Sequence, residues 1–119
     1  MERARFITHG GKRILELDLA RCSASEVEKV VRALPDLVTA EPRASLRMLA
    51  DFTGASFDNE ALRTIKEAAI FNKAYIKKTA WIGVESLPHS FQEDASRFSR
   101  REFPVFKSRV EALDWLAKD

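Results

Sequence analysis

The chain has little of what marks an extracellular or metal-binding protein, and it has no excess of charge of one sign. Its 119 residues hold a single cysteine, Cys22, which excludes an internal disulfide and a cysteine-rich zinc site. Twenty basic and eighteen acidic side chains leave a formal charge of +2, which is too near balance to predict nucleic-acid binding. No apolar run reaches the length of a signal peptide or the roughly 20 residues of a membrane span. We therefore expect a soluble, cytoplasmic protein that has no membrane span and binds no nucleic acid.

Catalytic and cofactor motifs are missing as well. The sequence contains no glycine-rich phosphate loop, no nucleophile elbow and no paired-carboxylate motif. His9 and His89 stand 80 positions apart, without a Cys, Asp or Glu at a recognised ligand spacing, so no metal site is predicted. Cys22 has no identifiable histidine partner and is better explained as a small buried apolar residue than as a nucleophile. We expect no enzymatic activity, no cofactor and no bound transition metal.

What the sequence does contain is enough apolar residues for one folded domain. Hydrophobic residues make up 45% of a 13.5 kDa chain, which can build a core but leaves no room for a second domain. We therefore expect residues 1–119 to form a single domain. Residues 4–20 predict two strands around a turn at Gly10 and Gly11, because glycine takes positive φ without a Cβ clash.

Strands and helices then alternate along the chain. Further strands are predicted at residues 45–52, 74–84 and 103–106. The first helix is predicted to begin at Ser25, which fits a capping box with Glu28 three residues later. Pro35 should kink or stop this helix, because its ring clashes with the preceding turn. Residues 36–42 fit a resumed helical turn or a loop equally well.

Three more helices are indicated by apolar residues at helical spacing. The first starts at Asn59 and would bury Leu62, Ile65, Ala68 and Ala69. The second starts at Pro88 and would bury Leu87, Phe91, Ala95 and Phe98. The third starts with a capping box of Ser108 and Glu111 and would bury Val110, Leu113, Leu116 and Ala117. The predicted order is ββαβαβαβα, which indicates an α/β fold with a mostly parallel sheet covered by helices.

With that order in place, four segments carry a resemblance to a known family. They are "ITHGGKRILELDL", "LADFTGASFD", "FNKAYIKKTAWIGV" and "FPVFKSRVEALDWLA", in this order. The chain resembles the STAS domains, and more closely their small, single-domain SpoIIAA-like branch, which is related in fold to the CRAL-TRIO lipid-transfer domains. The resemblance covers roughly residues 5–117, and none of the four segments is an enzyme signature.

The resemblance implies a regulatory protein-interaction module of bacterial type. STAS domains of the antagonist type carry a phosphorylatable serine just after an aspartate at the start of the second helix, where a partner kinase docks. On this chain the aspartate falls on Asp58 and the serine position on Asn59. Asparagine has no hydroxyl, so docking is expected here without serine phosphorylation. Thr53 and Ser56 are the nearby hydroxyls.

The same junction is a candidate site without reference to any family. In a parallel sheet, ligands bind beyond the carboxyl ends of the strands, where loops lead into helices. The candidate residues for binding a partner are Asp51, Thr53, Gly54, Ser56, Asp58 and Asn59. A purely structural role explains them too: Asp58 or Asn59 would cap the helix, and Gly54 would permit the turn. A pair of acids could also hold Mg²⁺ weakly, but one such pair is poor evidence for a metal site.

A basic and aromatic stretch at residues 97–109 is the second candidate. Its cations are Arg97, Arg100, Arg101, Lys107 and Arg109, and its aromatic residues are Phe98, Phe103 and Phe106. Such a mixture suits an RNA or an anionic lipid surface. The balanced overall charge favours the alternative, in which the phenylalanines anchor the segment in the core and the arginines face water. Lys73, Lys77 and Lys78 are interpreted as cations that complement a helix C-terminus.

Two hypotheses of function follow. The first is a non-enzymatic module that docks an unknown protein partner through the loop 51–59 and the helix that this loop opens. The second is a module that binds a small apolar ligand, such as a lipid, in a cavity between the helices and the sheet. At this chain length such a cavity would have to be small, or shared across a homodimer.

Overall fold

The computed structural model describes residues 3–119, so the first two positions of the predicted domain lie outside the described residues. The elements follow the predicted order ββαβαβαβα. They are β1 (Ala4–His9), β2 (Lys12–Asp18), α1 (Ala24–Val38), β3 (Leu46–Asp51), α2 (Asn59–Phe71), β4 (Ile76–Ile82), α3 (Phe91–Ser99), β5 (Val105–Phe106) and α4 (Arg109–Ala117). Two short 3₁₀ turns, Lys73–Tyr75 and Val84–Ser86, flank β4. No helix within residues 3–119 has the length and apolar character that crossing a membrane requires.

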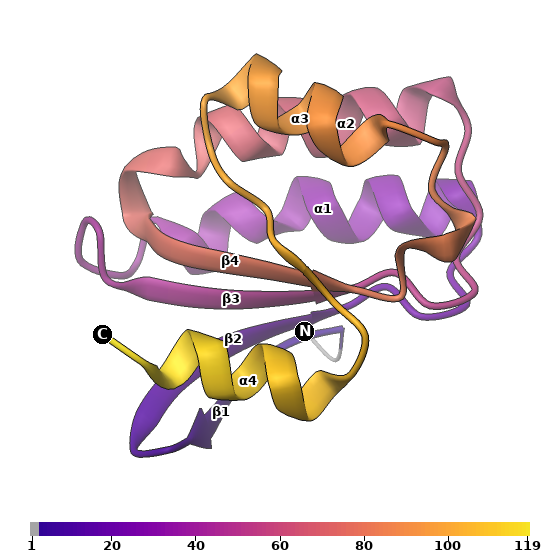
Figure 1. The fold of residues 1–119 in the computed structure, drawn as a ribbon. Helices are drawn as coiled ribbons and strands as arrows, with labels where there is room; N and C mark the ends of the chain where they lie inside the picture. The colour runs from indigo at the N-terminus through magenta and orange to yellow at the C-terminus, as the bar shows by residue number, and fades with distance from the viewer. Residues whose placement is uncertain (1–2) are drawn as a thin grey trace.

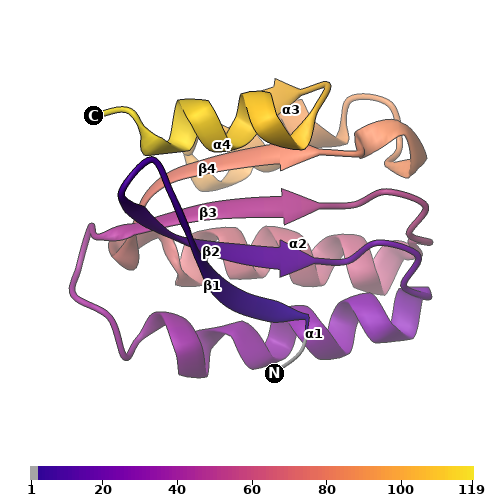
Figure 2. The same cartoon turned by 90° about the horizontal axis from the view of Figure 1, so that it is seen from below.

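The strands form one five-stranded sheet in the order β1-β2-β3-β4-β5. Figure 2 shows β2, β3 and β4 side by side in this sheet. β1 runs antiparallel to β2, and the other neighbouring pairs are parallel. The helices α1, α2 and α3 cover one face of the sheet, and α4 covers the other (Figure 1). The prediction of an α/β fold with a mostly parallel sheet between helices is confirmed.

Each face of the sheet has its own apolar core. The larger core lies under α1, α2 and α3 and includes Trp81, which stacks on Phe103 at 4.7 Å and meets Phe52 edge-on at 4.9 Å between ring centroids. The smaller core lies under α4 and is formed by Ile14, Leu49, Ala80, Ile82, Ala112, Leu113 and Leu116. α4 packs on the central strands β3 and β4 and covers the apolar side chains on this face of the sheet.

Two cations from the sheet hold the carboxyl end of α4. Arg47 donates from Nη1 to the carbonyl of Leu116 at 2.5 Å, and Lys78 donates from Nζ to the carbonyl of Trp115 at 2.7 Å. The last carbonyls of a helix lack the usual i+4 partners, and they carry the negative end of its dipole. Of the three lysines interpreted as complementing a helix C-terminus, Lys78 does so, but at α4, and Lys77 pairs with Asp119 instead.

The first helix differs from its prediction at both ends. Its N-cap is Ser23, which forms a complete capping box with Glu26, whereas we predicted the box at Ser25 and Glu28. Both pairs have the required spacing, so the sequence pattern could not separate them. Pro35 does not stop the helix, which continues to Val38. Val38 is fully buried in the larger core, and this burial outweighs the one helical hydrogen bond that proline cannot make.

The buried faces of α3 and α4 agree with prediction only in part. α3 begins at Phe91 and not at Pro88, and Phe98 is 56% exposed, because the buried face runs through Phe91, Ala95 and Ser99. In α4, Leu113 and Leu116 are buried as predicted, but Val110 is 61% exposed, Ala117 is only partly buried, and Ala112 is buried instead. In each helix the predicted stripe included one large apolar residue, Phe98 or Val110, that packing against the sheet leaves exposed.

Candidate functional site

The loop after β3, residues 52–58, leaves the sheet at its carboxyl edge, between the loops that follow β2 and β4. Backbone hydrogen bonds continue beyond the strands and fix the loop from both sides. Arg21 N–H donates to the carbonyl of Thr53 at 2.8 Å, Phe52 N–H donates to the carbonyl of Ile82 at 3.0 Å, and Ser56 N–H donates to the carbonyl of Cys22 at 2.9 Å. The loop therefore has a defined conformation before any partner binds.

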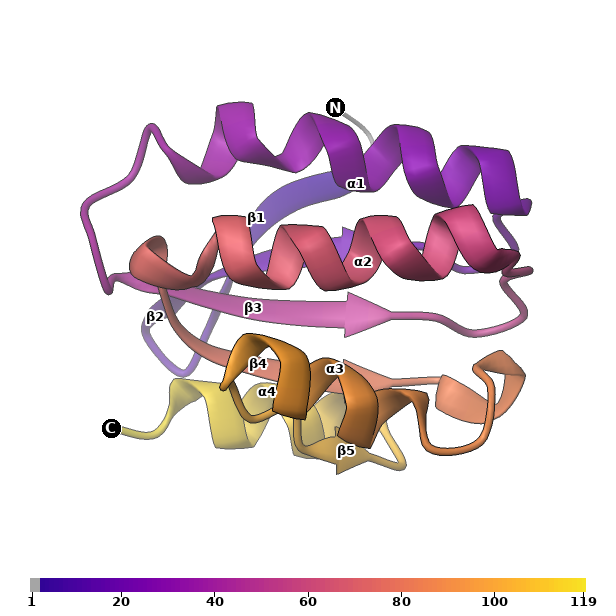
Figure 3. The ribbon, with the colours of Figure 1, turned by 90° about the horizontal axis from the view of Figure 1, so that it is seen from above.

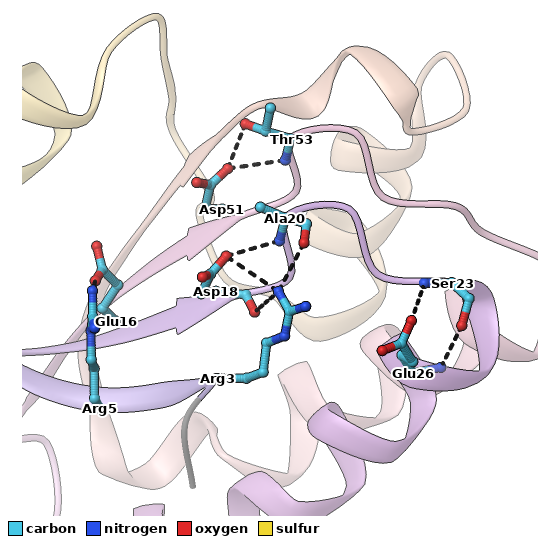
Figure 4. Close-up of polar contacts among 9 residues, drawn as sticks. All are labelled: Arg3, Arg5, Glu16, Asp18, Ala20, Ser23, Glu26, Asp51 and Thr53. Atoms are coloured by element: carbon cyan, nitrogen blue, oxygen red, sulfur yellow. Dashed lines mark hydrogen bonds and ion pairs between the residues drawn. The ribbon is translucent and has the colours of Figure 1, made fainter.

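Asp51 ends β3 and holds the first turn of the loop. Its carboxylate accepts from the Thr53 N–H at 3.0 Å and from the Thr53 hydroxyl at 2.6 Å (Figure 4). Asp18, its register partner at the end of β2, accepts in the same way from the Ala20 N–H at 2.9 Å. Arg3 lies 3.7 Å from the Asp18 carboxylate. Each aspartate therefore holds the first turn of the loop that follows it. For Asp51, this is the structural role considered in the sequence analysis.

Gly83 presses directly on this turn from the neighbouring loop. A Cβ at Gly83 would lie 2.1 Å from the Thr53 hydroxyl and 2.6 Å from the Thr53 backbone nitrogen. Its φ of +66° is also in the left-handed region. Only glycine lets the two loops approach this closely.

The underside of the loop is apolar and its outer side is polar. Phe52 and Ala55 are buried, and Phe57 packs on Phe52 with 6.0 Å between ring centroids. The predicted site residues on the outer side are all exposed to solvent: Thr53, Gly54, Ser56, Asp58 and Asn59. Asp51 is partly buried.

Asp58 and Asn59 have different roles at the start of α2. Asp58 is the N-cap, and its carboxylate accepts from the Ala61 N–H at 2.8 Å. Asn59 is the first residue of the helix, and no hydrogen bond of its side chain occurs within residues 3–119. The alternative that Asn59 caps the helix is therefore wrong, and its side chain is free to contact a partner.

The buried face of α2 agrees with prediction only in part. Ile65 and Ala69 are buried as predicted, together with Ala61 and Thr64. Leu62 and Ala68 are only partly buried. The partly buried Leu62 lines a surface groove between α2 and α3, two helices that lie side by side (Figure 3).

This α2–α3 groove begins at Asn59 and has a volume of about 450 Å³. It is lined by Asn59, Leu62, Arg63, Lys66, Pro88, His89, Phe91, Asp94 and Phe98. The ammonium of Lys66 lies 5.6 Å from the ring centroid of Phe91 and 5.9 Å from that of Phe98. The groove therefore combines an apolar floor with cations, and it is continuous with the candidate loop.

The interior cavity under α1, α2 and α3 is much smaller, with a volume of about 50 Å³. Asn72, 2% exposed, lies in its wall, and the Oδ1 atom of this residue has no hydrogen-bond partner among residues 3–119. Pockets for drug-sized ligands usually have volumes of about 300–1,000 Å³. The cavity has room for a few water molecules, each of which needs about 10–15 Å³ on this scale.

The basic stretch 97–109 does not form one surface. Arg97 pairs with Asp94 at 3.4 Å, and Arg109 pairs with Glu16 at 2.7 Å. Arg101 is largely buried, so the expectation that all of these arginines face water is wrong for this residue. Phe103 is buried as expected, but Phe98 is not.

The remaining titratable candidates have structural surroundings. Cys22 is 1% exposed, and burial raises the pKa of its thiol, which confirms its interpretation as a buried apolar residue. His9 pairs with Asp114 at 2.7 Å. Within residues 3–119, no three His, Cys, Asp or Glu side chains are grouped as a metal site requires. The absence of a bound metal stays a prediction, and the two acids considered for Mg²⁺ are each occupied by backbone N–H groups.

Sequence reasoning missed Asp18 and Gly83 as parts of this junction. A signal for Asp18 exists: "LDLA" and "LADF" each place an aspartate at the end of an apolar strand, and each aspartate holds the residue two positions later. Gly83 gave no local signal, because its role depends on contact with a loop 30 positions away.

No protein-family model and no curated protein matches the chain. Among solved structures, the chain matches an uncharacterized protein of the DUF3478 family from Shewanella loihica PV-4, described as having a SpoIIAA-like fold. The TM-score is 0.72, and the match covers 95% of this chain and 91% of the other. The chain has a SpoIIAA-like fold. At 19% sequence identity the match confirms the fold that the resemblance implied, and the fold alone.

Proposed function

We propose that this SpoIIAA-like chain is a non-enzymatic interaction module, which docks a protein partner on the loop 51–59, on α2 and in the α2–α3 groove. The observation that carries the proposal is the continuity of the exposed loop with that groove at Asn59. An aromatic side chain that is more than half exposed in such a groove can anchor a partner, and Phe98 is exposed by 56%.

The rigidity of the loop supports the same proposal. Asp51, Gly83 and the backbone bonds from neighbouring loops fix Thr53 and Ser56 in place. A preorganised surface loses less conformational entropy when a partner binds, so more of the contact energy contributes to affinity. Asn59 cannot be phosphorylated, so we propose that docking proceeds without a phosphorylated serine at this position.

The alternative, a module for a small apolar ligand, has less support. A cavity of about 50 Å³ is far below the volume of a lipid-binding pocket, and apolar side chains fill the space between helices and sheet. Docking on the surface needs no such space.

The experiment compares two variants of exposed apolar residues. Phe98→Ala removes the anchor from the groove, and Val110→Ala removes a similarly exposed side chain, 61% against 56%, from α4. Tagged wild type and both variants are purified from the native cell, and bound proteins are quantified by mass spectrometry. We expect Phe98→Ala to weaken the main partner at least about tenfold and Val110→Ala to retain it, with thermal unfolding of both near wild type.

Equal recovery of every partner with Phe98→Ala and Val110→Ala would place the docking surface elsewhere. Native mass spectrometry of the same samples distinguishes partner docking from the alternative, the binding of a small apolar ligand. A stoichiometric small mass that co-purifies with wild type and with both variants would favour a ligand-binding module.

A further inference from the structure

β4 contains an extra residue opposite the start of β3. Leu46 pairs with Ile76 and the next residue, Arg47, pairs with Lys78, so Lys77 is the bulged residue of a β-bulge. A bulge re-aims side chains locally and disrupts their alternation between the two faces of the sheet. Here the successive Lys77 and Lys78 line the same surface cleft.

This β4 cleft has a volume of about 390 Å³ and a strongly unbalanced charge. It is lined by Lys73, Ile76, Lys77, Lys78, Thr79, Arg101, Glu102 and Trp115, and thus by four cations and one carboxylate. β5 leaves it open, because β5 pairs only with Trp81 and Ile82 at the far end of β4. Figure 3 shows β5 as a short arrow beside the carboxyl-terminal part of β4.

Arg101 forms the wall between this cleft and the interior cavity. Its guanidinium donates to the carbonyl of Ala69 at 3.0 Å and to the hydroxyl of Thr79 at 2.6 Å, and it lies 4.9 Å from the ring centroid of Phe103. None of the ion pairs within residues 3–119 includes Arg101 or Lys73. A largely buried guanidinium without a carboxylate is unusual, because buried charges are normally paired.

Burial opposes the charge of two cleft cations, and at Lys78 neighbouring cations add repulsion. Burial lowers the pKa of Arg101 to about 10. Burial, Arg47 and Lys77 lower the pKa of Lys78. An anion held in the cleft would relieve this repulsion. Lys73 and Arg101 would gain an acidic partner, whereas Lys77 already lies 3.8 Å from the exposed carboxylate of Asp119.

We propose that the β4 cleft binds a compact polyanion that carries phosphate or carboxylate groups, held by Lys73, Lys77 and Arg101. The ammonium of Lys78 already donates to the carbonyls of Trp115 and Lys118 at the end of α4. Lys78 therefore attracts the anion through its positive charge and makes no direct contact with it. A purely structural explanation exists for each part: lysines protect sheet edges against aggregation, and Arg101 caps the end of α2. Neither explanation requires the four cations to surround one open cleft that has a single acid.

The site lies beside the early part of β4, whereas the docking loop leaves the carboxyl end of β3. Polyanion binding in the cleft is therefore independent of partner docking, and either proposal stands if the other fails.

The test uses pyrophosphate and citrate as separate probes at low ionic strength, with binding followed by backbone amide chemical shifts. A matched addition of sodium chloride controls for ionic strength. We expect saturable shifts at residues 73–79 and 101–102 with at least one probe. The probe that binds more tightly identifies phosphate or carboxylate as the preferred group.

The variants are Lys73→Gln and Lys77→Gln, with Lys29→Gln on the exposed side of α1 as the matched control. These lysines are exposed, so the fold should be retained. We expect each cleft variant to weaken binding by about threefold to tenfold, as expected for loss of one charge contact, and the control to bind like wild type. Equal weakening in Lys29→Gln, or the same shifts with sodium chloride, would overturn the proposal. So would the absence of saturable shifts with both probes.

Discussion

Gly83 and Thr53, from the loops after β4 and β3, lie in direct contact, and the Thr53 hydroxyl occupies the space of the missing Gly83 Cβ. Replacing Gly83 with alanine should therefore displace the Thr53 turn and strain a left-handed backbone at the same time. The backbone term costs about 1–2 kcal/mol and overpacking adds about 1–3 kcal/mol. We expect Gly83→Ala to lower the free energy of unfolding by about 2–5 kcal/mol in urea titrations.

Gly11→Ala is the matched control for this prediction. Gly11 has a φ of +77°, but a Cβ there would meet nothing within 4 Å. Gly11→Ala should lower the free energy of unfolding only through backbone strain, by about 1–2 kcal/mol. If the two variants are equally stable, the contact with Thr53 has no energetic effect, and the loop is less tightly held than the geometry indicates.

The packing of α2 is tested by two neighbouring residues. Ile65 is 7% exposed in the larger core, and Ile65→Ala should cost about 2–5 kcal/mol of unfolding free energy. Arg63 is exposed and, among the described residues 3–119, pairs only with Glu60 on the same helix, so Arg63→Ala should cost less than about 1 kcal/mol. Chemical denaturation of the two variants measures the difference, and similar losses would show that the phase of α2 is wrong.

Element order and fold class were predictable because periodicity is a local property. Alternating apolar residues specify β2 and β3, and three- and four-residue spacing specifies α2, whatever the rest of the chain does. The helix ends were less predictable. Ser23 and Ser25 each stand three residues before a glutamate, and Pro35 stays helical only because Val38 is buried by tertiary packing.

The candidate site was predictable as a loop and not as a surface. The aspartate, Gly54 and the exposed hydroxyls follow from the sequence of the junction. The α2–α3 groove does not, because it depends on the distance between two helices and on Phe98 facing outward. The β4 cleft depends on a bulge, which no residue pattern announces, and on Arg101, which comes from a distant segment.

The link between β2 and α4 predicts a pH dependence. Arg109 donates from Nε to the buried Glu16 at 2.7 Å, and Arg5 donates to the other carboxylate oxygen. Burial alone would raise the pKa of Glu16, but Arg109 and Arg5 outweigh it and lower the pKa below the ordinary 4.5. A lowered carboxyl pKa stabilises the fold above the unfolded value, and this contribution is lost as the pH falls through the folded value.

Glu16→Gln removes this contribution. The stability difference between wild type and Glu16→Gln should be largest above pH 4.5 and should shrink as the pH falls below it. Because Arg109 is half exposed, water screens the pair, and its share should be no more than about 1 kcal/mol. In an Arg109→Gln background, the stability lost on replacing Glu16 with Gln should be smaller in the same pH range. Thermal unfolding at several pH values measures it, and a difference that grows on acidification would contradict the assignment.

The last prediction concerns Asn59, the position where the resemblance to antagonist-type STAS domains implies a serine. Asn59→Asp adds one negative charge, a partial imitation of the −1.5 to −2 of phosphoserine. The first turn of α2 should tolerate this charge, because the N-terminal end of a helix dipole favours anions. Asp58 remains the cap, and Asp58→Ala is the contrasting variant, which should cost about 0.5–2 kcal/mol. The effect of Asn59→Asp should therefore be lower partner affinity at an unchanged melting temperature.

Pull-downs with wild type and Asn59→Asp, with melting temperatures measured alongside, test this separation of affinity from stability. Unchanged affinity for every partner would remove Asn59 from the docking surface.

The structure also ranks the two nearby hydroxyls as sites for a phosphate. The Thr53 hydroxyl donates to Asp51 and is pressed by Gly83, so a phosphate there would face a carboxylate and break the turn. Ser56 is exposed, and its side chain makes no hydrogen bond within residues 3–119. If protein from the native cell carries phosphate in this loop, we expect it on Ser56, and phosphate on Thr53 would show that the loop opens.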